Sequence, residues 1–167
     1  MKTLKRPESL DEVAQWSFSE EEFGRNLADF EHALQRLRSR PALAKTISEP
    51  PRLLARQFPT GNISDAWLAS YAEELAFRFK LSYPNWIWEP DRFLDHPWHQ
   101  DAQTPRLRIW HTLKSPASFT RRNLFVDINL PPIKLTPGRP RKSAAHKREM
   151  NRLRVARHRE RKGTPGG

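Results

Sequence analysis

The sequence predicts an all-α protein, in which a small helical domain is followed by a basic tail. Two stretches, residues 20–38 and 62–79, repeat large apolar side chains every three or four positions, which is the spacing of amphipathic helices. The last fifth of the chain has almost no apolar surface and carries most of the net charge of +11. These observations divide the chain into a helical body, residues 1–130, a proline-rich linker, 131–137, and a basic tail, 138–167.

The first helices are predicted by capping patterns and by one apolar stripe. Ser9 begins a capping box, so a short helix should run to about Trp16. Ser19 and the acidic residues after it favour the start of a longer helix over residues 20–38. Its stripe consists of Phe23, Leu27, Phe30, Leu34 and Leu37. Pro41 should stop this helix soon afterwards. The stripe should face the core, or in part a protein partner or a second copy of the chain.

The next segment is predicted to contain a short helix, a turn and the second long helix. Pro51 can begin a short helix with apolar side chains as far as Phe58. Residues 59–62 should form a turn, after which Asn62 or Ser64 caps a helix that runs through residue 79. Its apolar stripe consists of Trp67, Tyr71, Leu75 and Phe79.

The second half of the body is less periodic. Residues 82–104 are rich in proline and tryptophan, which indicates an ordered loop packed over the helices. Residues 107–113 read as a short helix, and Ser115 should be the N-cap of another. The apolar residues 124–126 should be extended against the body.

The tail carries a dense positive charge. Residues 138–162 hold eleven Lys or Arg and two Glu, whereas residues 1–137 hold 19 basic and 17 acidic side chains. Such a block repels itself and should be disordered when alone. It suits a polyanion, because each phosphate contact releases counterions; the alternative is a solvated tail that only aids solubility. The predicted nucleic-acid-binding residues are Arg139, Arg141, Lys142, Lys147, Arg148, Arg152, Arg154, Arg157, Arg159, Arg161 and Lys162.

The start of the tail, Gly138-Arg139-Pro140-Arg141, resembles the centre of the AT-hook. In that family an extended peptide lies in the minor groove of A·T-rich DNA, and the resemblance implies this role for Arg139 and Arg141. Pro140 fixes its own φ and biases Arg139 toward an extended conformation. Narrow A·T minor grooves have a negative potential that attracts arginine. The motif departs from the family at Pro137, where an arginine is usual.

The later part of the tail has a second pattern. The residues that match the basic region of basic-leucine-zipper proteins are Asn151, Arg152, Arg159, Arg161 and Lys162. The paired alanines expected in that region are Arg154 and Val155 here, and no heptads follow. The pattern is therefore either a coincidence or a generic basic helix that folds on nucleic acid, and it does not predict a zipper.

The middle of the body contains short stretches that together resemble one family. They are Gln57-Phe58-Pro59-Thr60-Gly61, Asp65-Ala66-Trp67-Leu68, Trp88-Glu89-Pro90-Asp91-Arg92-Phe93-Leu94, Pro97-Trp98 and Arg121-Arg122-Asn123-Leu124-Phe125. On these residues, the segment 56–126 resembles an uncharacterised bacterial family whose members look like partners of nucleotidyltransferase-like proteins in toxin–antitoxin-type gene pairs. The resemblance implies an antitoxin-like role and a cognate toxin as partner, and it implies no fold or mechanism.

Two arginines are the body's own candidates for a binding site. Arg121 and Arg122 could contact phosphate or an acidic partner, or they could brace a helix end by pairing with nearby carboxylates; the sequence leaves both interpretations open. Glu73 and Glu74 are predicted to be surface carboxylates or ion-pair partners.

Catalytic and metal chemistry has little support. The chain has no cysteine, which excludes disulfides and Cys-based metal sites. It also lacks a glycine-rich phosphate loop, a nucleophile elbow and an HExxH motif. His96 and His99, with Asp95 and Asp101, form the one cluster that resembles a metal site, but their spacing is not diagnostic. We therefore expect no metal, no cofactor and no enzymatic activity.

The sequence predicts the function of a non-enzymatic DNA-binding accessory or regulatory protein, with an antitoxin-like protein as one candidate. The tail would bind DNA, with a preference for A·T-rich duplex, and the helical body would bind a protein partner or a second copy of itself. The alternatives are an RNA-binding protein with an arginine-rich tail and an enzyme with a basic targeting tail. The sequence contains no apolar run long enough to span a membrane, so we expect a cytoplasmic protein.

Overall fold

The computed structural model describes residues 5–101, 103–136, 148–155 and 157. The chain divides into two units, the body Met1–Thr136 and the tail unit Pro137–Gly167. The elements of the body are α1 (Leu10–Gln15), α2 (Glu20–Leu34), α3 (Arg40–Ser48), α4 (Gly61–Phe79), the 3₁₀ helices η1 (Asn85–Trp88) and η2 (Pro90–Arg92), β1 (Trp98–His99), α5 (Pro105–Lys114), α6 (Ala117–Thr120) and β2 (Leu124–Phe125). The predicted all-α fold is confirmed, since the only strands among the described residues are these two short ones.

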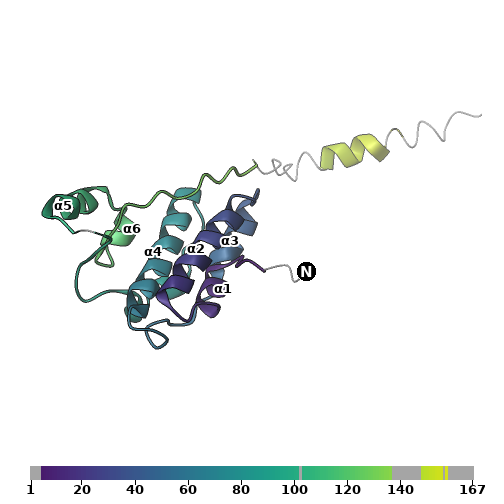
Figure 1. Cartoon of the computed structure of the whole chain (residues 1–167). Helices are drawn as coiled ribbons and strands as arrows, with labels where there is room; N and C mark the ends of the chain where they lie inside the picture. The colour runs from purple at the N-terminus through teal and green to yellow at the C-terminus, as the bar shows by residue number, and fades with distance from the viewer. Residues whose placement is uncertain (1–4, 102, 137–147, 156, 158–167) are drawn as a thin grey trace, which may run out of the picture. The chain divides into compact units, whose positions relative to one another are not determined.

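Helix α4 is the centre of the body. It lies between α1, α2 and α3 on one side and α6 on the other (Figure 1), and it contacts η1, η2 and β2 as well. Its stripe reaches both neighbours: the ring of Tyr71 meets Phe30 of α2 at 6.1 Å, and Trp67 meets Phe119 of α6 at 5.6 Å. Most of α4 is buried, including polar positions. A helix covered on nearly all sides must pair any charge that it carries.

The first two helices begin as their sequences predict. Ser9 Oγ accepts from Glu12 N at 3.1 Å, and Ser19 Oγ accepts from Glu22 N at 3.2 Å. Each glutamate also accepts the backbone N–H of the residue before the N-cap, Glu8 or Phe18, so the side chain of the first turn holds the chain that enters the helix. Helix α2 ends at Leu34, earlier than the predicted residue 38.

Helix α3 was not predicted, because Pro41 was interpreted only as a stop. Ser39 is the N-cap of α3, and its Oγ accepts from Ala42 N at 3.3 Å. Pro41 lies in the first turn, where a missing N–H breaks no helical hydrogen bond. Leu43 and Ile47 of this helix are buried in the core.

The segment between α3 and α4 is folded around one carboxylate. The predicted helix after Pro51 is wrong, since none of residues 51–60 is helical and residues 54–60 form bends and turns. The backbone N–H groups of Leu54 and Ala55 donate to Asp65 of α4, at 2.8 and 2.9 Å. The predicted N-cap at Asn62 or Ser64 is also wrong, because Thr60 takes that position without a side-chain hydrogen bond.

The proline- and tryptophan-rich segment is ordered and packs over the helices, as predicted. Its two 3₁₀ turns both contact α4. Trp86 is buried, and its Nε1 donates to the carbonyl of Ile47 at 3.0 Å. Strand β1 ends the segment and pairs in parallel with β2, with Trp98 opposite Leu124. The loop thereby closes the side of the core that the long helices leave open.

Helices α5 and α6 follow in a different arrangement from the one expected. Ser115 is the C-cap of α5, and Pro116 is the N-cap of α6 without a side-chain bond. The Ser115 hydroxyl instead joins α5 to the chain after β2: it accepts from the Val126 N–H at 2.6 Å, and its single proton lies between the carbonyls of His111, at 2.6 Å, and Val126, at 2.9 Å. The apolar residues 124–126 are extended, as predicted.

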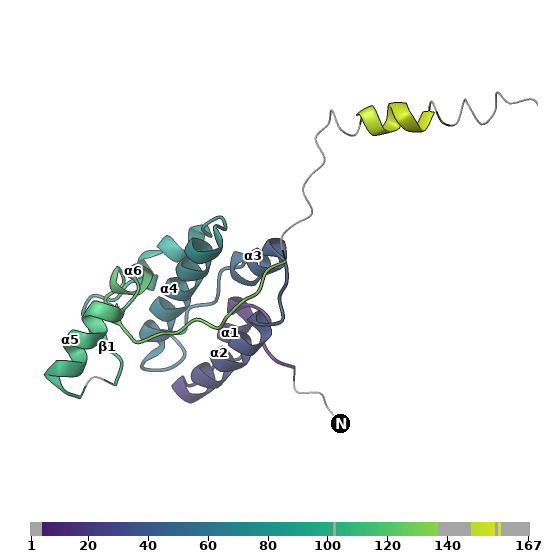
Figure 2. The same ribbon diagram turned by 90° about the horizontal axis from the view of Figure 1, so that it is seen from above.

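The segment predicted as a linker belongs to the body. Residues 126–136 cross the body as an extended strap that runs from the α5–α6 side toward α3 (Figure 2). Ile133 and Leu135 pack against the core, and Thr136 N donates to the carbonyl of Arg38 at 2.8 Å. The boundary between the two units therefore falls after Thr136, not after residue 130.

Candidate functional site

The described part of the tail is helical. Residues 148–155 and 157 have helical backbone, and Arg148, Arg152, Arg154 and Arg157 are exposed. Arg152 and Arg154 are two residues apart, so they lie about 200° apart around the helix. The described arginines therefore point to more than one side of this helix. The other predicted contacts lie outside the described residues: Arg139, Arg141, Lys142, Lys147, Arg159, Arg161 and Lys162.

The body candidates Arg121 and Arg122 meet at one carboxylate of α4. Arg121 Nη1 lies 2.7 Å from Glu73 Oε1, and Arg122 Nη1 binds Glu73 Oε2. Arg122 also donates to two backbone carbonyls, those of Ser118 and Ile87, each at 2.8 Å. Glu73 itself is almost fully buried. The two arginines thus hold the end of α6 and the loop of η1 onto the middle of α4.

The two arginines differ in what they offer to a ligand. The Arg122 side chain has no exposed surface, whereas the Arg121 side chain is 50% exposed. Burial lowers the pKa of the Arg122 guanidinium from its ordinary value, and the hydrogen bond and charge of Glu73 oppose this shift. Arg122 is a structural residue with no surface left for a phosphate. Arg121 remains half exposed, with its guanidinium 5.6 Å from the centre of the Trp88 ring.

A pocket of about 580 Å³ adjoins this network, between α4 and the start of α6. Three exposed aromatic side chains line it, those of Phe77, Tyr83 and Trp88. Glu74 lies at its inner side, but both of its oxygens have partners, Arg78 Nε at 2.6 Å and Ser118 Oγ at 2.7 Å. The carboxylates of this pocket therefore serve the fold. They are buried ion-pair partners, so the predicted ion-pair role of Glu73 and Glu74 is confirmed and the alternative, a surface location, is wrong.

A second buried ion pair was not predicted. Arg92 of η2 is 1% exposed and its Nη1 lies 3.5 Å from Asp65 Oδ1; its Nη2 donates to the carbonyl of Pro51 at 2.5 Å. Burial raises the pKa of the Asp65 carboxyl, while the N–H groups of Leu54 and Ala55 and the charge of Arg92 oppose this shift. The pair ties the loop of η2 and the turn before α4 to one point of α4.

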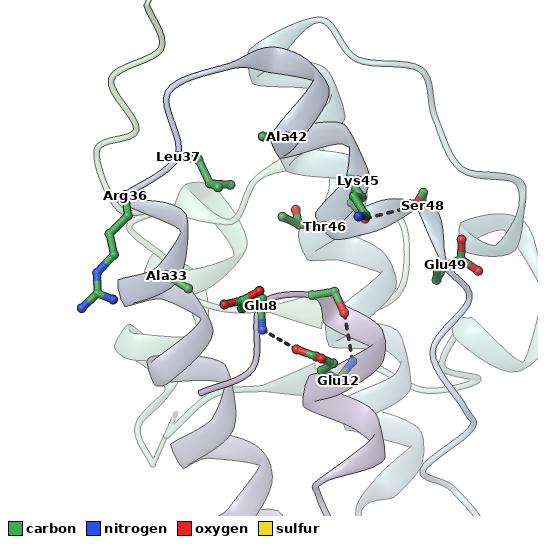
Figure 3. Close-up of a pocket in the computed structure, with 11 residues that line it drawn as sticks. Glu8, Glu12, Ala33, Arg36, Leu37, Ala42, Lys45, Thr46, Ser48 and Glu49 are labelled. Atoms are coloured by element: carbon green, nitrogen blue, oxygen red, sulfur yellow. Dashed lines mark hydrogen bonds between the residues drawn. The ribbon is translucent and has the colours of Figure 1, made fainter. Parts of the chain in front are cut away.

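A separate pocket of about 520 Å³ lies among α1, α2 and α3. Figure 3 shows that its wall combines acidic side chains, such as Glu8 and Glu49, with the basic side chains of Arg36 and Lys45. The Glu12 carboxylate accepts the N–H of Glu8 at 2.7 Å, as part of the α1 cap (Figure 3). A wall residue of the pocket, Glu12, thus already serves the cap of α1, and the mixed charge of the wall favours no particular ligand.

The histidine cluster of the loop does not gather into a metal site. No group of three or more His, Asp or Glu among the described residues is placed to hold a metal ion. His99 instead stacks on Phe125, with ring centroids 4.7 Å apart. His96, Asp95 and Asp101 are exposed.

The pH dependence of stability should report on His99. Its pKa is lowered, first by partial burial and then by the positive charges of Arg108 and His111. A histidine whose pKa is lower in the folded protein takes up its proton more readily when unfolded. The free energy of unfolding should therefore be highest above the unfolded pKa of about 6.5 and should fall as the pH drops through that value. Urea unfolding at pH 8, 6 and 5 measures this.

In the His99→Gln variant, the free energy of unfolding should fall less as the pH drops, because the titrating group is gone. His96→Gln is the matched control, since His96 is exposed in the same loop, and it should follow the wild-type profile. An equal pH dependence in His99→Gln and the wild-type protein would contradict the prediction.

No helix in the described part of the chain is long and apolar enough to cross a membrane. Comparisons of the chain with protein-family models, curated proteins and solved structures found no match.

Proposed function

We propose that this chain is a non-enzymatic nucleic-acid-binding accessory or regulatory protein, in which the tail binds DNA and the body binds a protein partner. The observation that carries the proposal is the separation of charge: residues 138–162 hold eleven Lys or Arg and two Glu, and the remainder of the chain is close to neutral. A local excess of this size gives salt-dependent affinity for phosphate backbones without any sequence reading.

The helical part of the tail supports a duplex as the ligand. An α-helix with its side chains is about 10–12 Å across, which matches a major groove about 12 Å wide. Arg152 and Arg154 extend from opposite sides of the helix, so they could reach the two phosphate backbones that border the groove. The hook-like residues Arg139 and Arg141, which lie outside the described residues, would add minor-groove contacts at A·T-rich sequence.

The partner of the body that we propose is a cognate toxin in an antitoxin-like arrangement. This half of the proposal rests on the resemblance carried by residues 56–126 to a family of toxin–antitoxin-type gene pairs. In that arrangement one unit of the chain would bind DNA and the other unit would bind protein, which is consistent with the division of the chain after Thr136.

Binding of the full chain and of residues 1–136 to three ligands tests the tail. The ligands are A·T-rich duplex, G·C-rich duplex and structured RNA of equal length, each measured over a salt series. We expect the full chain to bind with a steep dependence on salt and to prefer A·T duplex, and we expect residues 1–136 to lose most of this binding. Equal binding by both proteins would overturn the proposal, and a preference for RNA would replace DNA by RNA as the ligand.

Two double variants of the full chain separate the hook from general charge. Arg139→Ala with Arg141→Ala should weaken A·T binding more than G·C binding. Arg159→Ala with Arg161→Ala removes the same charge from the same tail and should weaken both duplexes equally. Equal losses in the first variant would contradict the hook interpretation.

A further inference from the structure

Helix α5 exposes four large apolar side chains. Leu107 is 42% exposed, Ile109 62%, Trp110 50% and Leu113 76%. The helix contributes only His111 to the buried residues. Isolated apolar residues on a surface are ordinary, but four on one ten-residue helix form a patch of the kind that marks an interaction site.

These four side chains share one side of the helix. At 100° per residue, they lie within an arc of about 160° around the helix axis, and His111 lies outside this arc. Around the arc the order is Ile109, Leu113, Trp110 and Leu107. Together with Arg106 they line one surface hollow of about 360 Å³. The helix lies at the edge of the body in both views (Figures 1 and 2), attached through β2 and the Ser115 hydroxyl. The apolar stripe, called the α5 stripe below, therefore faces away from the core.

The charge around the α5 stripe indicates the chemistry of its partner. The sequence has no Asp or Glu from residue 102 to residue 126. Arg106 lies within the stripe's hollow, and Lys114 ends the helix with its Nζ 4.9 Å from the ring of Trp110. A partner that covers the stripe thus meets cations and no carboxylate from this stretch. Complementarity requires acidic groups beside apolar ones on the partner.

A second copy of the chain fits this surface poorly. Two copies of α5 packed on each other would bring the same cations together without a carboxylate between them. A helix of ten residues is also only about 15 Å long, too short to supply the roughly 800 Å² per partner of a stable dimer. A short helical segment of another protein needs no more surface than α5 provides.

We propose that the α5 stripe is the docking site for an acidic amphipathic helix of a partner protein. The proposal deepens the proposed function, because it rests on the body having a protein partner and gives that partner its chemistry. Apolar side chains of the partner helix would fill the hollow between Leu107 and Leu113, with Trp110 as the central anchor. Its carboxylates would pair with Arg106 and Lys114.

A designed peptide tests the proposal on the full chain. The probe is a fluorescein-labelled 18-residue peptide with Leu at helical i, i+3, i+4, i+7 spacing and Glu on its other faces. A scrambled peptide of identical composition is the control. The basic tail attracts both peptides equally, so the difference between them measures docking of the apolar face. We expect binding at physiological salt that is at least tenfold tighter for the amphipathic peptide, and equal affinities would overturn the proposal.

Substitutions locate the site. Leu113→Glu and, independently, Ile109→Glu should each abolish the tenfold preference, because both side chains are exposed and both changes add negative charge. Phe18→Glu adds the same charge at another exposed apolar residue and should keep the preference. Thermal melting checks that each variant is folded. Retention of the preference by both α5 variants, or its loss in Phe18→Glu, would overturn the assignment to α5.

Two further measurements exclude other occupants and separate this proposal from the function of the tail. If the wild-type chain dimerises with increasing concentration and Leu113→Glu does not, a second copy of the chain occupies the stripe in place of the partner helix. If the wild-type chain binds phosphatidylserine vesicles and Leu113→Glu does not, the occupant is a membrane. The duplex affinity of Leu113→Glu should equal that of the wild-type chain. If the wild-type chain binds duplex but shows no preference for the amphipathic peptide, the docking site on α5 is wrong and the function of the tail stands. If it prefers the amphipathic peptide but does not bind duplex, the function of the tail is wrong and the docking site stands.

Discussion

Replacing Glu73 by alanine should lower the free energy of unfolding by about 3–5 kcal/mol, the usual effect of breaking a buried ion pair by removing one partner. The carboxylate binds two arginines, and one of them, Arg122, has no exposed side-chain surface. Without Glu73 the Arg122 guanidinium would remain in the core without a carboxylate, hydrogen-bonded to the carbonyls of Ser118 and Ile87 and lying over the rings of Trp88 and Phe93. Urea unfolding of the full chain at neutral pH measures the loss.

Two variants show whether the burial of the charge is the cause. Glu21→Ala is the matched control, since Glu21 is also helical and also pairs with an arginine, Arg25, but its side chain is 86% exposed; we expect a change within about 0.5 kcal/mol. Arg122→Met should cost less than Glu73→Ala, because Glu73 keeps its partner Arg121 at the surface. A loss below about 1 kcal/mol in Glu73→Ala would mean that Arg122 finds water or another partner.

The long helices could be predicted because their signals are local. The apolar spacing of α2 and the caps at Ser9 and Ser19 lie within a few residues of the structure that they determine. Helix α3 was missed because Pro41 ends one helix and starts another equally well, and its sequence alone does not separate the two. Ser115 was placed in the wrong role for a similar reason, since its hydroxyl partner, Val126, is distant in the sequence.

The sequence left open whether Arg121 and Arg122 pair with carboxylates, but it could not name the partners of the buried arginines, because those partners are separated along the chain. Glu73 and Arg122 are 49 positions apart, and only the fold brings them together. The position of Glu73 in the apolar middle of α4 was nevertheless a usable signal, because a charge in a helix that is apolar on most sides must be paired. For Asp65 the sequence offered no comparable signal, since it lies in the first turns of α4.

The tail contrasts with the body in this respect. Its candidate residues were predicted from charge density and, for Arg139 and Arg141, from a short motif; both are properties of the sequence that need no partner elsewhere in the chain. They stay predictions. The α5 stripe was missed for the opposite reason: residues 107–113 were correctly predicted as a helix, but apolar residues in a helix are usually core. Their exposure became apparent only when the structure placed α5 at the edge of the body.

Substituting Gly61 by alanine should cost about 3 kcal/mol or more, at the upper end of overpacking effects. A Cβ at this position would lie 1.9 Å from the carbonyl oxygen of Leu54 and 2.6 Å from the N atom of Ala55. Both are backbone atoms, so no side-chain rotation relieves the contact. Moving this backbone would also strain the two hydrogen bonds that Leu54 and Ala55 donate to the buried Asp65, whose charge pairs with Arg92.

Gly24→Ala makes the comparison decisive, because it is the same substitution in another helix. Apart from its chain neighbours and the backbone of its own helix, no atom lies within 4 Å of a Cβ at Gly24, so alanine meets no tertiary clash there. Its better helix propensity should raise the free energy of unfolding by about 0.5–1 kcal/mol. The two variants should therefore shift urea midpoints in opposite directions. A Gly61→Ala midpoint close to that of the wild-type chain would mean that the turn at Leu54 does not pack against the start of α4. In that case the Asp65–Arg92 pair would not be the point that holds the loops on α4.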